Sequence, residues 1–97
     1  MDLAEFKQSV IENNQPADLG HFLLALWFDG VGDWESAHNI VQDIPGAEAS
    51  WVHAYLHRKE GDNWNAGYWY RRANKKPSAK IVSDEWEDLV RYFIGNP

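Results

Sequence analysis

The chain has 97 residues, a length typical of one domain, and 44% of its residues are hydrophobic. It contains no cysteine, which excludes disulfide bonds, thiolate metal ligands and a cysteine nucleophile. Fifteen acidic residues against nine basic ones give a net charge of −6. This charge argues against nucleic acid as a partner, because phosphate binding requires Lys and Arg in excess. The longest apolar run, 22–28, is far too short to span a membrane.

Apolar residues recur at spacings of three and four along the chain, the pattern of helices buried on one side. No segment has a convincing strand pattern. Six helices are predicted in chain order, over about residues 3–14, 18–29, 34–44, 48–60, 62–74 and 83–94. The second is apolar on nearly every side and is therefore expected at the centre of the core. The fold is predicted to be all-α, with residues 1–97 forming a single helical-repeat domain.

Local signals mark the ends of these helices. Asp2, Asp33 and Asp62 can each cap the following helix, because a short acidic side chain accepts hydrogen bonds from free helix amides. Gly61 can end the fourth helix in a left-handed conformation. Ser83 is followed by acidic residues, which the helix dipole favours in a first turn, and is expected to start the last helix.

The chain also matches itself at an offset of 29 residues. The aligned pairs are Ala25 with Ala54, Gly32 with Gly61, Asp33 with Asp62, and Ala37 with Ala66. Small residues at these positions let two antiparallel helices approach closely, so the match predicts two stacked helical hairpins. The first and last helices would then cap the two repeats.

The aligned residues resemble a known family. Those similar to the second half of a tetratricopeptide repeat are Gly61, Asp62, Ala66, Tyr70, Ala73 and Pro77, with a weaker copy at Gly32, Asp33, Ala37 and Val41. The resemblance covers about residues 20–77, but the period is 29 rather than 34 and only two copies are present. It implies a protein-interaction scaffold. The chain also resembles small bacterial proteins of uncharacterised function that carry GDWxxAH, WVHAYLHRxEGD and NAxYWYRRA elements, a likeness that implies no activity.

The histidines form the first candidate site. His53 and His57, four residues apart, share one face of a helix, and Glu60 continues that face. Two imidazoles and a carboxylate suit a divalent metal such as zinc, and His38 on the neighbouring repeat would add a third imidazole. Two alternatives stay open. One histidine could perform acid–base chemistry with Glu60 or Glu85 as orienting carboxylate, or the rings could simply be packed in the core.

Aromatic residues near helix starts, or away from the inward stripes, form the second candidate site. Exposed Trp and Tyr beside Arg are typical of binding hot spots. The predicted binding surface comprises Trp34, Trp64, Tyr68, Arg71 and Trp86, with His38, His53, His57 and Glu60 along a groove. The alternative is that each aromatic side chain only fills the core of a small protein.

The sequence therefore favours a small helical-repeat scaffold that binds a protein or peptide, without nucleic acid or membrane as partner. The alternative is a metal- or small-ligand-binding protein, with or without enzymatic activity, based on His38, His53 and His57. No nucleophile motif or phosphate loop is present, and no cofactor is expected beyond a divalent metal. The acidic N-terminus lacks a signal pattern, which indicates a cytoplasmic protein. Two repeats leave an apolar flank that a homodimer would cover.

Overall fold

The computed structural model describes all of residues 1–97, which form six helices and no strand. In chain order these are α1 (Leu3–Ile11), α2 (His21–Gly30), α3 (Trp34–Val41), α4 (Ala47–Lys59), α5 (Asn63–Arg72) and α6 (Val82–Gly95). The all-α prediction is confirmed. None of the six helices has both the length and the apolar character needed to cross a membrane.

Two helical hairpins form the middle of the chain. α2 packs against α3, α4 packs against α5, and the contact between α3 and α4 joins the two pairs. The turns are alike, since Gly32 and Gly61 have φ angles of +92° and +88°, which glycine adopts without strain. Asp33 and Asp62 then cap α3 and α5 through the backbone amide three residues on. The two Gly-Asp turns thus share one geometry, while the tetratricopeptide likeness stays a prediction.

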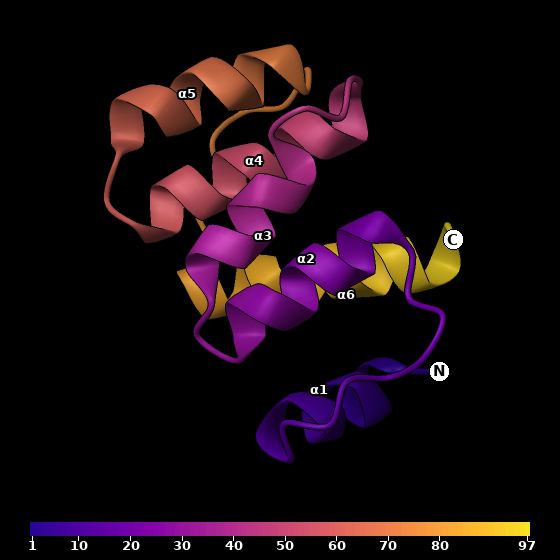
Figure 1. Cartoon of the computed structure of the whole chain (residues 1–97). Coiled ribbons are helices and arrows are strands. Elements are labelled where there is room, and N and C mark those ends of the chain that lie inside the picture. The colour runs from indigo at the N-terminus through magenta and orange to yellow at the C-terminus, as the bar shows by residue number, and fades with distance from the viewer.

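The core is centred on α2, which contacts α1, α3, α4 and α6. In Figure 1, α6 runs behind α2, and α1 and α5 lie at opposite ends of the molecule. Fully buried side chains from five helices meet in this core, among them Phe6, Leu26, Val41, Leu56 and Leu89. α5 is attached through a separate cluster of Ala54, Ala66 and Tyr70, where the small side chains allow α4 and α5 to lie close together.

Some helix ends differ from the prediction. The second helix was expected to start near Asp18, but Asp18 has a φ of 60° and lies in a turn, so α2 begins at His21. Asp tolerates this left-handed conformation because its short side chain can bond locally. Asn13, with a φ of 52°, likewise follows an earlier end of the first helix. α6 begins one residue before Ser83 and has no side-chain cap.

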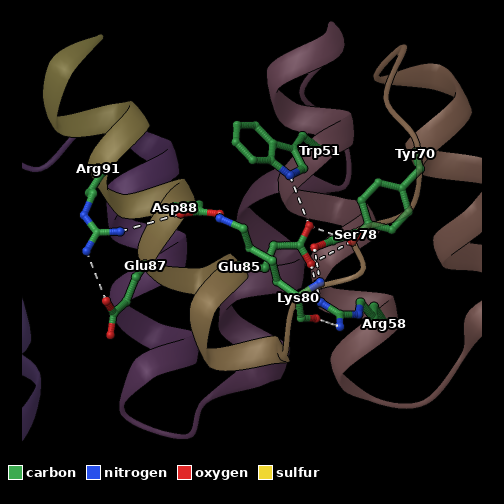
Figure 2. A network of polar contacts seen from close by, with 9 residues as sticks. All are labelled: Trp51, Arg58, Tyr70, Ser78, Lys80, Glu85, Glu87, Asp88 and Arg91. Carbon is green, nitrogen blue, oxygen red and sulfur yellow. Dashed lines mark hydrogen bonds and ion pairs between the residues drawn. The ribbon is translucent and has the colours of Figure 1, made fainter.

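A buried carboxylate ties the last three helices together. Glu85 on α6 is 2% exposed, and Figure 2 shows Trp51, Arg58 and Tyr70 converging on it. Arg58 Nη1 lies 2.8 Å from Oε1, the Tyr70 hydroxyl donates to Oε2 at 2.6 Å, and Trp51 Nε1 donates at 3.2 Å. Arg58 also donates to the carbonyl of Lys80. Burial, together with the adjacent carboxylate, raises the pKa of the Tyr70 hydroxyl. Glu85 therefore holds α6 to both helices of the second hairpin.

Candidate metal centre

Three of the four histidines meet between α3 and α4. His38 comes from α3, while His53 and His57 lie one turn apart on α4, with ring centroids separated by 4.8 Å. The shared helix face of His53 and His57 follows from their spacing. Whether His38 reaches them depends on how the hairpins stack, and the structure shows that the three rings converge.

The ring nitrogens are close enough to share one ligand. Nε2 of His38 and Nε2 of His53 are 3.0 Å apart, and the candidate ligand atoms of all three histidines lie within 4.8 Å of one another. Because two imidazole nitrogens can share only one proton, one of these two rings donates and the other accepts. Nδ1 of His57 is 2.8 Å from Oε1 of Glu60, which leaves its Nε2 available.

Burial keeps two of the imidazoles, those of His38 and His53, neutral. His53 is 5% exposed, and burial, followed by the neighbouring His38 and His57, lowers the pKa of His53 to about 4. Burial and the adjacent His57 also lower the pKa of His38, while Glu60 opposes that change. At neutral pH these two rings are therefore unprotonated. That is the form in which imidazole binds a metal ion.

Two tryptophans form walls around the cluster. The ring of Trp69 stacks on His53 with centroids 4.0 Å apart, and that of Trp34 stacks on His38 at 4.9 Å. Trp34 is itself held in place, because its Nε1 donates to the carbonyl of Leu56 at 2.7 Å. These contacts restrict the rotation of the imidazoles. The side chain of His57 retains 12% exposure and gives the cluster an opening to solvent.

Of the two carboxylates expected to orient a histidine, only Glu60 contacts one. Glu85 was the other, but it is bonded to Trp51, Arg58 and Tyr70 and to no histidine. A carboxylate on the far nitrogen of an imidazole fixes the tautomer of the ring and its orientation, as in the outer shell of metal sites. The contact between Glu60 and His57 has this form.

The remaining residues of the predicted binding surface lie in separate places. Trp34 belongs to the histidine cluster. Trp86 packs against Phe6, donates to the carbonyl of Leu26 at 3.0 Å, and borders the main core rather than the histidine cluster. Trp64 and Tyr68 are exposed on α5, by 77% and 39%, and Arg71 is exposed on the same helix. The predicted binding surface is thus divided among three places: the histidine cluster, the core and the outer face of α5.

A buried polar group between α2 and α4 was not among the predicted sites. Asp29, 1% exposed, accepts from the Tyr55 hydroxyl at 2.7 Å and pairs with Lys59 Nζ at 2.8 Å. Burial raises the pKa of the Tyr55 hydroxyl. A cavity of about 430 Å³ adjoins this group, with Trp86 among its lining residues. The sequence feature that could have indicated this group is that Asp29 is the only carboxylate in a largely apolar helix.

The geometry of the histidines supports two kinds of chemistry. Three imidazoles within reach of one ion form a zinc ligand set that leaves a fourth position for water or a carboxylate. A hydrogen-bonded pair of neutral imidazoles can also pass a proton from one ring to the other. Comparison of the chain with protein-family models, curated proteins and solved structures finds no match.

Proposed function

We propose that the protein binds a divalent transition metal ion, best matched by zinc, through His38, His53 and His57. The observation that carries this proposal is the convergence of three imidazoles from two hairpins, with ligand atoms within 4.8 Å of one another. Nitrogens bound to one tetrahedral zinc ion lie about 3.3 Å apart, given Zn–N bonds of about 2.0–2.1 Å. The Nε2 atoms of His38 and His53 are 3.0 Å apart, close to that separation, and a ligand atom of His57 lies within 4.8 Å of the other two histidines' ligand atoms.

Zinc fits this ligand set better than other common ions. Magnesium and calcium prefer oxygen ligands, whereas zinc, nickel and copper readily accept imidazole. Zinc has no preference for a planar arrangement and tolerates three protein ligands with one open position. A bound ion would join α3 of the first hairpin to α4 of the second. Metal binding is therefore expected to stabilise the stacking of the hairpins.

The direct test is a zinc titration of metal-free protein by calorimetry. We expect one zinc ion per chain, and we expect His57→Ala to weaken binding by more than about 100-fold, the upper end of what loss of an outer carboxylate costs. His21→Ala is the matched control, because His21 lies at the start of α2 and outside the cluster. Circular dichroism verifies that each variant is folded. Absence of binding at micromolar zinc would overturn the proposal, as would equal affinity of wild type and His57→Ala.

Glu60 provides a second, graded prediction. We expect Glu60→Ala to weaken zinc binding by roughly 10- to 100-fold, because the orientation and basicity of the His57 ring lose their support. Glu60→Gln is expected to lose less zinc affinity than Glu60→Ala, since an amide oxygen still accepts from Nδ1 of His57. Glu12→Ala, at the exposed C-terminal end of α1, makes the same change in net charge far from the histidines. An equal loss in Glu12→Ala and Glu60→Ala would assign the effect to net charge alone.

A further inference from the structure

The positive charges of the chain fall into two groups. Five of the nine Lys and Arg residues pair with carboxylates, namely Lys7, Arg58, Lys59, Lys80 and Arg91. The other four form no ion pair, although the chain has fifteen acidic residues, and all four lie within 71–76: Arg71, Arg72, Lys75 and Lys76. The unpaired positive charge is thus concentrated at one place.

The unpaired cations lie at one end of the molecule, in the last turn of α5 and just after it. α5 lies at one end of the molecule in Figure 1, and its only neighbouring helix is α4, so its opposite side faces solvent. The four unpaired cations are all exposed. The helix dipole accounts for cations in the last turn of α5, where Arg71 and Arg72 lie. It does not account for Lys75 and Lys76, which follow the end of the helix.

Exposed aromatic rings lie on the same helix. Trp64 is 77% exposed and Tyr68 is 39% exposed, and the two are one helical turn apart. Arg72, one turn further on, donates from Nη1 to the Tyr68 hydroxyl at 3.2 Å, and its guanidinium lies 5.6 Å from the Tyr68 ring centre. Trp, Tyr and Arg are the residue types enriched in binding hot spots. Trp64, Tyr68 and Arg72 therefore follow one another along α5 and offer an apolar anchor beside the positive charges.

We propose that this α5 surface, defined by Trp64, Tyr68, Arg71, Arg72, Lys75 and Lys76, binds an acidic peptide segment of a partner protein. The four unpaired cations attract Asp and Glu side chains, while Trp64 and Tyr68 take an apolar side chain between them. A peptide fits better than nucleic acid, because the net charge of −6 repels a long polyanion from the rest of the molecule. The α5 surface shares no residue with the proposed metal ligands, so the two sites can be tested separately.

The test measures the fluorescence anisotropy of a short labelled peptide of Asp and Glu with a central Leu and Phe. We expect binding that weakens between about 50 and 200 mM salt. The double variant Arg71→Ala/Arg72→Ala is expected to bind about tenfold or more weakly, as is Trp64→Ala. The matched control Lys80→Ala/Arg91→Ala removes the same net charge from cations that are already paired. It is expected to bind like the wild type.

Four results would overturn the proposal. The first is no binding of the peptide up to about 1 mM, which corresponds to a free energy too small for a specific contact. The second is an equal loss of affinity in the two double variants, which would mean general attraction to net charge. The third is unchanged binding by Trp64→Ala. The fourth is tighter binding of single-stranded DNA with the same number of charges, which would assign the α5 surface to nucleic acid.

Discussion

Replacing Glu85 by alanine is expected to lower the free energy of unfolding by about 3–5 kcal/mol, the cost of removing one partner from a buried ion pair. Glu85 is 2% exposed, and its removal leaves the guanidinium of the half-buried Arg58 without its carboxylate. The Tyr70 hydroxyl and Trp51 Nε1 lose their acceptor as well. Small domains are stable by only about 5–15 kcal/mol, so this loss is a large share of the total.

Urea unfolding followed by tryptophan fluorescence measures the effect. The matched control is Glu87→Ala, two residues further along α6, because Glu87 pairs with Lys7 and Arg91 at the surface. Such surface pairs contribute about 0–1 kcal/mol. Glu85→Gln keeps an acceptor for Tyr70 but removes the charge that faces Arg58, and it provides an intermediate value if Glu85→Ala does not fold. A loss in Glu85→Ala no larger than that in Glu87→Ala would contradict the structural role of Glu85.

The helices and hairpins could be predicted because their signals are local. The Gly61-Asp62 turn needs only a glycine that accepts a φ of +88° and a short acidic side chain to cap the next helix. The spacing of His53 and His57 similarly fixes their common face. These features depend on residues within one or two helical turns of each other, and the amino-acid sequence displays them directly.

His38 was expected to join His53 and His57 in a metal site, but the sequence alone does not determine whether the three rings converge, because that depends on how α3 crosses α4. His38 and His53 are separated by the turn between the hairpins, and no local signal sets their relative rotation. The burial of Glu85 was harder to predict than the histidine cluster, since a carboxylate at a helix start is typical of an exposed first turn and is seldom buried. Its burial follows from partners on two other helices. Trp86 was assigned to the predicted binding surface with the core as the alternative, and its Nε1 donates to the carbonyl of Leu26, sixty residues away.

Zinc at about 100 times its dissociation constant is expected to raise the free energy of unfolding by about 2.7 kcal/mol, provided that it binds the folded chain alone. For a domain of this size, that stabilisation corresponds to a rise in Tm of roughly 10–20 °C. The reason is geometric. His38 and His53 are brought to 3.0 Å by the stacking of the hairpins, so the complete ligand set exists only in the folded protein. Thermal unfolding monitored by circular dichroism, with and without zinc, measures the shift.

The same melts separate a native metal centre from weak binding to single histidines. An unfolded chain retains His53 and His57 four residues apart and can bind zinc weakly through them, which would reduce the shift in Tm. We expect His38→Ala and His57→Ala to abolish the shift and His21→Ala to preserve it, because His21 lies outside the cluster. A shift that persists in His38→Ala would mean that α4 alone holds the ion. In that case zinc would not connect the two hairpins, and the proposal that it stabilises the packing of α3 against α4 would be wrong.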